Sequence, residues 1–376
     1  MSQSPAGILR LHGLYYYVND LARSRRLFVD QLDFAEVAGG EDESGQYAIF
    51  EAGRARYIFV QPKENTGEAA AFLRAHPEGI GRIAFEVRDL DRAFEELERR
   101  GATPIMDIQS ADGPNGSIRY FDITTPFGAT TWRFLTRTGD VLDPDIPLYD
   151  SPRGGQNKYG FRVIDHITSN FRSLSPAILW MKHVMGFEQF WDIQFHTQDI
   201  RHSDAKGSGL KSIVMRDPDS GIKFANNEPK RPFFDQSQIS LFVDDLRCEG
   251  VQHTALALTD IIPAVRGLSE KSVPFLSTPN SYYEALPEHL KEIGVNELDE
   301  EISTLQELGI LVDGRAHKKY LLQIFLQEAA SIHNDKDAGP FFLEIIQRKG
   351  DPGFGGGNFK ALFKSIERQQ QAEGRA

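Results

Sequence analysis

The sequence predicts an α+β protein made of two halves that share one repeating order of elements. Within residues 9–135 the order strand, helix, strands occurs twice, a repeat of roughly 70 residues, and a repeat of this size sets the architecture of a chain. Residues 143–160 are rich in Pro, Gly and polar residues and indicate a linker. The same order of elements follows the linker. We therefore expect one domain at 1–150 and a second at 151–376.

The strands of the first half are predicted from short runs of aromatic and β-branched residues. They are expected at 9–18, 47–51, 56–61, 81–87, 103–108, 117–123 and 130–135. Helices are predicted where apolar residues recur at helical spacing, at 21–32, 68–75 and 90–100. Asp20 and Asp89 are expected to cap the first and last of these, and Gly101 to end the last.

The second half follows the same rules. Strands are expected at 161–170, 190–197, 211–216, 221–226, 250–258, 320–325 and 341–347, and helices at 174–185, 236–243 and 261–268. A partly helical insertion is expected at 282–305. A glycine-rich loop at 350–357 precedes an amphipathic helix at 358–370, which Asn358 would cap and which could close over a site as a lid.

Composition limits the classes of function. With 376 residues and 40% apolar content the chain is typical of a globular protein of two domains, and its net charge of −12 argues against binding to nucleic acid or anionic membranes. No apolar run approaches the length of a membrane-spanning helix, and the first residues do not have the pattern of a signal peptide. A single cysteine, Cys248, excludes an internal disulfide, so we expect a cytoplasmic protein.

The two halves differ at one set of positions. When the halves are overlaid by the spacing between strand and following Asp, His253 falls on Arg82 and Glu344 falls on Arg133, while His166 falls near Gly13. The second half thus carries His, His and Glu where the first half carries Gly, Arg and Arg. We expect a divalent cation site in the second half only.

His166, His253 and Glu344 are separated by 87 (253 − 166) and 91 (344 − 253) residues, and each lies inside a predicted strand. Two imidazoles and one carboxylate leave open positions on a metal, an arrangement suited to non-haem Fe(II) and O₂ chemistry. Zinc hydrolysis with the same ligand types is an alternative, although the chain has no HExxH helix. A lone histidine in a strand is more often a packed core residue, so the matching repeat positions carry this inference.

Neighbouring strands offer further side chains for a pocket around the metal. Polar candidates are Ser212, Asn227, Gln238, Gln252 and Gln323, and apolar wall candidates are Phe325, Phe342, Phe354 and Phe359. The segment GFGGGNF is not followed by the Lys-Ser/Thr of a phosphate-binding loop, so its glycines favour a mobile loop over a nucleotide site.

The second half resembles the 4-hydroxyphenylpyruvate dioxygenase family of the vicinal-oxygen-chelate superfamily. The resemblance rests on IDHITSN, EGVQHTALAL, NSYYEAL, YLLQIF, FFLEIIQR and GFGGGNFKALF, in that order. It implies two vicinal-oxygen-chelate domains, each of paired βαβββ modules that form an open barrel-like sheet. It also implies an Fe(II) enzyme that converts 4-hydroxyphenylpyruvate and O₂ to homogentisate and CO₂ in tyrosine and phenylalanine catabolism, with a keto acid that serves as its own reductant.

The resemblance also implies roles for individual residues. His166, His253 and Glu344 would bind Fe(II), and Gln323, Asn358, Phe354 and Phe359 would form the catalytic surroundings, with the two phenylalanines against the substrate ring. The substrate would further contact Ser212, Asn227, Gln238, Gln252 and Phe325. A homo-oligomer, dimer or tetramer, is expected.

The chain departs from the family pattern at a few positions. Ala225 and Asn226 replace Pro and Ile, and Leu343 replaces the Phe before the ligand glutamate; all three are expected in the pocket wall. Two alternatives stay open at this point. The chain could be a hydroxymandelate synthase or another aryl-pyruvate oxygenase, or it could be a non-catalytic vicinal-oxygen-chelate protein that binds a small aromatic molecule.

Overall fold

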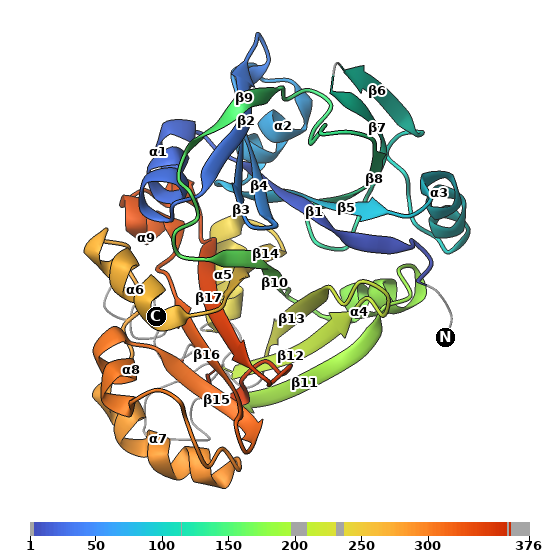
Figure 1. The fold of residues 1–376 in the computed structure, drawn as a ribbon. Coiled ribbons are helices and arrows are strands. Elements are labelled where there is room, and N and C mark those ends of the chain that lie inside the picture. The colour runs from blue at the N-terminus through green and yellow to red at the C-terminus, as the bar shows by residue number, and fades with distance from the viewer. Residues whose placement is uncertain (1–3, 114, 197–208, 231–236, 359–360, 362–376) are drawn as a thin grey trace.

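A computed structural model shows two mixed sheets built from consecutive parts of the chain (Figure 1). The structure describes residues 4–113, 115–196, 209–230, 237–358 and 361. Within these ranges, no helix has the length and apolar character needed to cross a membrane.

The first sheet has nine strands in the order β6-β7-β8-β5-β1-β4-β3-β2-β9. Its strands are β1 (Ile8–Tyr17), β2 (Ala35–Glu41), β3 (Gly45–Ala52), β4 (Ala55–Pro62), β5 (Gly79–Val87), β6 (Gln109–Gly113), β7 (Gly116–Ile123), β8 (Thr131–Arg137) and β9 (Leu148–Gly154). The helical elements of this half are α1 (Leu21–Arg25), the π-helical segment η1 (Arg26–Gln31), α2 (Gly67–Ala75) and α3 (Leu90–Arg99).

The second sheet has eight strands in the order β11-β12-β13-β10-β14-β17-β16-β15. Its strands are β10 (Phe161–Asn170), β11 (Glu188–His196), β12 (Gly209–Arg216), β13 (Lys223–Pro229), β14 (Gly250–Leu258), β15 (Leu311–Ala316), β16 (Lys319–Phe325) and β17 (Phe342–Lys349). The helices are α4 (Ser175–His183), α5 (Gln238–Leu246), α6 (Ile261–Glu270), α7 (Asn280–Glu292), α8 (Ile302–Leu308), α9 (Ala329–His333) and the short 3₁₀ segment η4 (Lys336–Ala338).

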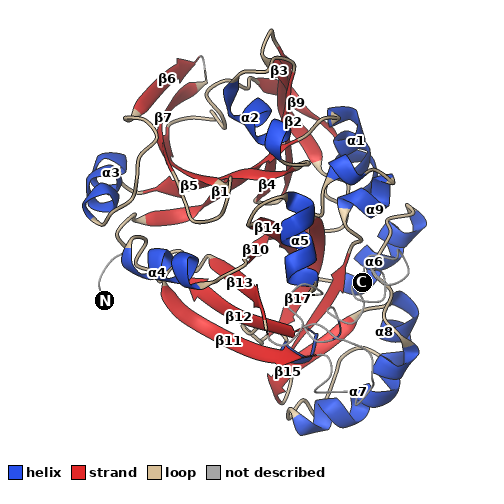
Figure 2. Ribbon diagram, turned by 180° about the vertical axis from the view of Figure 1, so that it is seen from behind, coloured by secondary structure: helices blue, strands red, loops and turns tan. Residues whose placement is uncertain are grey.

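Helices of the second half cover different parts of its sheet. Seen from behind, α5 lies over the middle strands, and it packs against β10, β13 and β14 (Figure 2). The inserted helix α7 packs against α8 and against the edge strand β15. The insertion therefore flanks the edge of the sheet next to β16 and β17.

Each sheet contains two βαβββ modules joined side by side, as expected, and the first sheet has β9 as an additional edge strand. In the first sheet the modules meet at the antiparallel pair β1 and β5, and in the second sheet at the antiparallel pair β10 and β14. The strand register matches the sequence overlay of the halves. Ala84 pairs with both Gly13 and Arg133, and Ala255 pairs with both His166 and Glu344.

Several predicted elements need correction. The strand expected at 103–108 is wrong: Pro104, which has no N–H to donate, makes only an isolated bridge to Ile123, and the edge strand β6 begins at Gln109. The predicted linker at 143–160 contains β9, which pairs with β2, so this part of it is a strand of the first sheet. Strands β2 and β15 were not expected, because both contain glycine and few β-branched residues.

The C-terminal helix is described only at its start. Residues 356–358 are already helical, so the helix begins before Asn358, which is not its N-cap. Of the remainder of the predicted helix only Ala361 is described, and it is helical; Phe359 lies outside the described residues.

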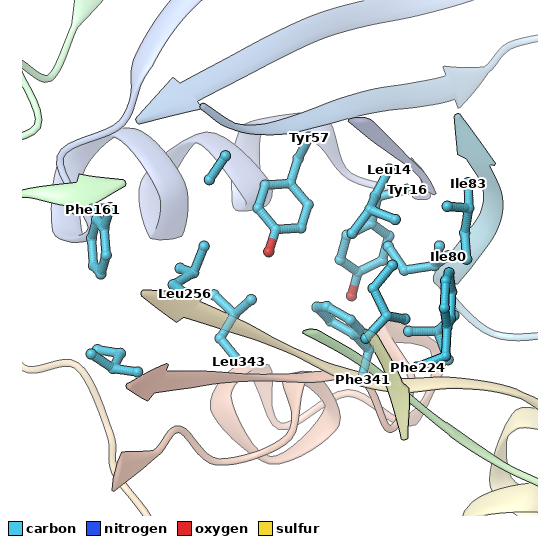
Figure 3. Packing of buried hydrophobic residues seen from close by; sticks show 14 of the residues in the cluster. Leu14, Tyr16, Tyr57, Ile80, Ile83, Phe161, Phe224, Leu256, Phe341 and Leu343 are labelled. Atoms are coloured by element: carbon cyan, nitrogen blue, oxygen red, sulfur yellow. The ribbon is translucent and has the colours of Figure 1, made fainter. Parts of the chain in front are cut away.

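A continuous apolar core joins the two sheets. Tyr16 and Tyr57 of the first half face Phe341, Leu343 and Leu256 of the second half (Figure 3), and all five are buried. Within this core the hydroxyl groups of Tyr57 and Thr254 lie 2.6 Å apart and form a hydrogen bond. Because Thr254 follows His253 directly, the first half supports the strand that carries this histidine.

Candidate metal centre and active site

Three buried side chains of the second sheet meet at one point. His166 on β10, His253 on β14 and Glu344 on β17 offer ligand atoms that all lie within 4.8 Å of one another. Glu344 Oε2 lies 3.2 Å from His166 Nε2 and 3.3 Å from His253 Nε2. The structure thus brings together the three residues of the second half that the sequence overlay matched to Gly, Arg and Arg of the first half.

A β-bulge precedes each of the two histidines. Asp165 on β10 and Gln252 on β14 are extra residues in the pairing of these strands, and a bulge changes the direction in which side chains point. In both cases the bulged residue contacts the Nδ1 of the histidine that follows. His166 Nδ1 lies 3.0 Å from Asp165 Oδ1, and His253 Nδ1 lies 3.0 Å from Gln252 Oε1.

These contacts fix what the histidines can offer to a metal. The carboxylate of Asp165 and the side-chain carbonyl of Gln252 accept hydrogen bonds, so both Nδ1 atoms act as donors and each neutral ring keeps a lone pair on Nε2. Both lone pairs then face the carboxylate oxygen of Glu344. Three electron-rich atoms this close share either a proton or a cation, and two imidazoles with one carboxylate fit a divalent transition metal.

Electrostatics around Glu344 agree with a site that holds positive charge. Burial raises the pKa of this carboxyl, but the adjacent His166 and His253 outweigh burial and set it at about 2. Burial opposes protonation of His166, yet the carboxylates of Glu344 and Asp165 raise its pKa. Burial lowers the pKa of His253. Without a metal, positive charge on the histidines balances the buried carboxylate of Glu344; with neutral histidines, a bound cation would take that place.

Asp165 links the metal centre to the glycine-rich loop. Its carboxylate accepts from Arg348 Nε at 2.7 Å and from Arg348 Nη2 at 2.6 Å, while Arg348 Nη1 donates to the carbonyl oxygens of Asp351 at 3.0 Å and Gly353 at 2.5 Å. One guanidinium therefore holds both the partner of His166 and the base of the loop.

Aromatic rings enclose the metal centre. The ring of Phe354 packs on His166 at a centroid distance of 4.8 Å, and Phe342 stacks on His253 at 4.8 Å. Phe325 lies 6.0 Å from the His253 ring. All three phenylalanines are buried, so they keep the histidines in an apolar surrounding.

Gln323 and Asn358 reach the centre through hydrogen bonds. Gln323 Nε2 donates to Glu344 Oε1 at 2.7 Å, and Asn358 Nδ2 donates to Gln323 Oε1 at 2.8 Å. Gln323 therefore contacts the Glu344 carboxylate directly, and Asn358 acts on it through Gln323.

A second group of polar side chains begins farther along β10 and continues onto the neighbouring strands β13 and β12. Asn170, Asn227 and Ser212 form a row across β10, β13 and β12, and Asn227 Nδ2 donates to Asn170 Oδ1 at 3.0 Å. Among the described residues, Asn170 Nδ2, Asn227 Oδ1 and Ser212 Oγ are buried with no hydrogen-bond partner. The row is four residues beyond His166, about 13 Å along the strand. Unpaired buried polar atoms are costly, so this row is suited to a polar group at the far end of a ligand.

The other predicted site residues are also placed. Gln238 is the first residue of α5 and is buried, next to Ser237, which caps the helix. Gln252 lies at the bulge beside His253. Phe359, one of the two expected ring contacts, lies outside the described residues.

Comparisons with known proteins cover nearly the whole chain. Models of the Glyoxalase/Bleomycin resistance protein/Dioxygenase superfamily match residues 12–121 and 163–287. A 4-hydroxyphenylpyruvate dioxygenase of Dictyostelium discoideum is 31% identical over 96% of this chain and 97% of that protein. Those of Xenopus tropicalis and Caenorhabditis briggsae are 32% and 36% identical, over 97% and 83% of this chain and 92% and 77% of theirs.

This chain belongs to the 4-hydroxyphenylpyruvate dioxygenase family. Among solved structures, a triple mutant of 4-hydroxymandelate synthase from Streptomyces coelicolor shares the fold, with a TM-score of 0.80 at 23% identity over 97% of this chain and 99% of that one. The expected pair of vicinal-oxygen-chelate domains is thereby confirmed.

Two of the three departures from the family pattern are not in the pocket wall. Asn226 lies on the face of β13 away from the metal, where Nδ2 donates to Phe224 O at 2.9 Å and Ile213 O at 3.1 Å. Leu343 points into the core between the halves (Figure 3). Side chains alternate between the faces of a strand, so neighbours of pocket residues face away. Ala225 does lie on the pocket side, where it packs with Val214 and Phe354.

Sequence reasoning missed Asp165, Asn170 and Arg348. The signal for Asn170 was present, because it follows His166 by four residues and so shares its face of the strand. The roles of Asp165 and Arg348 depend on a bulge and on a contact between distant segments. The periodic spacing of residue types along the sequence predicts neither of these features.

Proposed function

We propose that this chain is an Fe(II)-dependent 4-hydroxyphenylpyruvate dioxygenase, which converts 4-hydroxyphenylpyruvate and O₂ to homogentisate and CO₂ in tyrosine catabolism. The observation that carries the proposal is the buried His, His, Glu cluster in a chain that aligns with dioxygenases of this name over nearly its full length. The atoms balance without a second reductant, since one oxygen atom is retained in the new carboxylate and the other on the ring.

His166, His253 and Glu344 would hold the metal. Fe(II) at this position supplies open coordination positions for an α-keto acid and for O₂. Asp165 and Gln252 keep Nδ1 of each histidine protonated and so keep Nε2 available as a ligand. Phe354, Phe342 and Phe325 exclude water around the histidines, which strengthens every electrostatic interaction inside the site.

The far end of the substrate would lie at the amide row. A phenol hydroxyl donates one hydrogen bond and accepts others, and Asn227 Oδ1, Asn170 Nδ2 and Ser212 Oγ supply an acceptor, a donor and a group that does both. Gln238 and Gln252 complete the proposed polar set. Phe325 and Phe354 are proposed walls for the ring, and Phe359 stays a prediction.

The alternative is that the same metal ligands act on the same substrate but release hydroxymandelate. The solved synthase shares the fold at 23% identity, whereas the relatives named dioxygenases reach 31–36%. A non-catalytic binding protein would not need to keep all three metal-binding side chains together.

The deciding experiment is reconstitution with Fe(II) without oxygen, followed by O₂ and 4-hydroxyphenylpyruvate, with products identified by chromatography and mass. Homogentisate in equal amount to CO₂ is expected. Hydroxymandelate as the main product would overturn the proposed position of oxidation but leave the metal site in place. If O₂ uptake did not depend on the metal, the assignment of the chain as an oxygenase would be overturned.

The compartment and the assembly belong to the proposal as well. We place the enzyme in the cytoplasm because its single cysteine suits a reducing compartment. We also propose a homo-oligomer, dimer or tetramer, in which the half without the cluster supports assembly.

A further inference from the structure

The two oxygens of Glu344 have separate partners. Oε2 faces the two histidines at 3.2 and 3.3 Å, whereas Oε1 accepts a hydrogen bond from Gln323 Nε2 at 2.7 Å. Rotation of the carboxylate would break the bond to Gln323. The orientation of the metal-facing oxygen therefore depends on where the Gln323 amide is held.

The Gln323 amide is held by a chain of hydrogen bonds that ends at the inserted helix α7. Gln323 Oε1 accepts from Asn358 Nδ2 at 2.8 Å, and Asn358 Oδ1 accepts from the hydroxyl of Tyr282 at 3.0 Å. The same hydroxyl accepts the N–H of Val312 on β15 at 2.8 Å. The single hydroxyl proton of Tyr282 faces two acceptors, Asn358 Oδ1 at 3.0 Å and Val312 O at 2.9 Å, and each amide nitrogen of the chain donates to the next oxygen.

We propose that Tyr282 is a positioning residue for the metal ligand Glu344 and acts through Asn358 and Gln323. The inference rests on the proposed function for the metal, but not on the identity of the product. Gln323 and Asn358 are 2% and 1% exposed, so water does not compete for these bonds and a missing partner is not replaced. Burial also raises the pKa of Tyr282 well above its usual value, so its hydroxyl remains a donor at neutral pH.

The loop before Asn358 is built to bring it to Gln323. Gly355 has a φ of +64°, and a Cβ at this position would lie 2.9 Å from Gln323 Oε1, so a larger residue would displace the amide. Gly357 N–H donates to Asp313 Oδ2 at 2.5 Å, next to Val312 on β15. Two adjacent residues of β15 therefore hold the loop and the hydroxyl that ends the chain.

The test compares Tyr282→Phe with Tyr283→Phe. Tyr283 is the next residue of α7 and is buried, whereas Tyr282 is partly buried. The hydroxyl of Tyr283 donates to Ile310 O at 3.1 Å and does not belong to the chain. Binding of Co(II), which is stable in air, is measured by titration calorimetry without substrate, and the apo proteins are compared by circular dichroism and thermal unfolding.

We expect Tyr282→Phe to weaken Co(II) binding about tenfold, the lower end of the effect of partners of metal ligands, while Tyr283→Phe binds as the unsubstituted chain does. With Fe(II), kcat should fall and KM for the keto acid should change little. Asn358→Leu should cause at least the same loss of metal affinity, and adding Tyr282→Phe to it should cause no further loss, because both break one chain.

Equal metal affinity of Tyr282→Phe and Tyr283→Phe would overturn the proposal, and so would additive losses in the double variant. A chain that binds Co(II) and shows the expected Tyr282 effect but releases another product would overturn only the proposed function. A chain that binds no divalent metal would overturn both.

Discussion

Arg133 on β8 has the same register position in the first sheet that Glu344 has on β17 in the second. Each pairs with an alanine at the centre of its sheet, Ala84 for Arg133 and Ala255 for Glu344. In the first sheet Arg133 forms two hydrogen bonds with Asp122, at 2.7 and 2.8 Å, and its guanidinium lies 4.0 Å over the Tyr120 ring. A guanidinium therefore supplies the positive charge in one half, whereas a metal would supply it in the other.

Substitution of this arginine should affect stability and not metal content. Arg133→Met leaves the buried Asp122 without its main partner, and breaking a buried pair in this way costs about 3–5 kcal/mol in free energy of unfolding, measured with urea on the apo protein. Iron per folded chain should remain that of the unsubstituted protein. The double variant Arg133→Met, Asp122→Leu should recover most of the loss, and a folded single variant with less iron would contradict the asymmetry between the halves.

Removal of the carboxylate ligand Glu344 should affect metal content and not the fold. Glu344→Ala should abolish high-affinity Fe(II) binding and turnover while the circular dichroism spectrum is preserved, because one of three ligands is removed from a module that is already folded. The matched control is Glu36→Ala, since Glu36 is also a buried glutamate but pairs with Arg25 in the first half. Retained Fe(II)-dependent turnover in Glu344→Ala would disprove the ligand assignment.

The two neighbouring asparagines of β13 offer a matched test of the substrate end. Asn227→Leu removes the acceptor proposed for the phenol hydroxyl, and we expect kcat/KM for 4-hydroxyphenylpyruvate to fall about 10–100-fold, corresponding to roughly 1.5–3 kcal/mol. Turnover of phenylpyruvate, which lacks the hydroxyl, should change far less. Asn226→Leu changes the opposite face of the strand and should leave both values within roughly twofold. Equal losses for both substrates in Asn227→Leu would place the phenol elsewhere.

His333 should make stability depend on pH where the two halves meet. Burial and the nearby Arg23 and Arg26 lower the pKa of His333 from 6.5 to about 4. Between these values the unfolded chain binds the proton and the folded chain does not, so stability falls as the pH drops from about 6.5 to about 4. Because solvent screens a half-buried group, we expect a loss of about 1 kcal/mol from this residue. Urea unfolding across this pH range should show a smaller slope for His333→Gln, and an identical slope would refute the assignment.

The repeat made the metal-binding cluster predictable. His166, His253 and Glu344 each lie in a strand whose counterpart in the other half could be overlaid by spacing, and the observed register confirms the overlay residue by residue. Side-chain alternation along β10 also contained the information that Asn170 faces the same way as His166. Prediction was weakest where strands carry glycine, as in β2 and β15, and where a proline interrupts a run, as at Pro104.

The sequence by itself determined the types of side chain in the cluster, the half that carries it and the order of the modules. These follow from local periods and spacings along the chain. Only the tertiary structure decided that Asn226 and Leu343 face away from the metal and that bulges place Asp165 and Gln252 against the histidines. It alone connected Tyr282 to Glu344. The physical reason is that each of these relationships depends on the register and packing of segments far apart in the chain, which no local pattern of residues encodes.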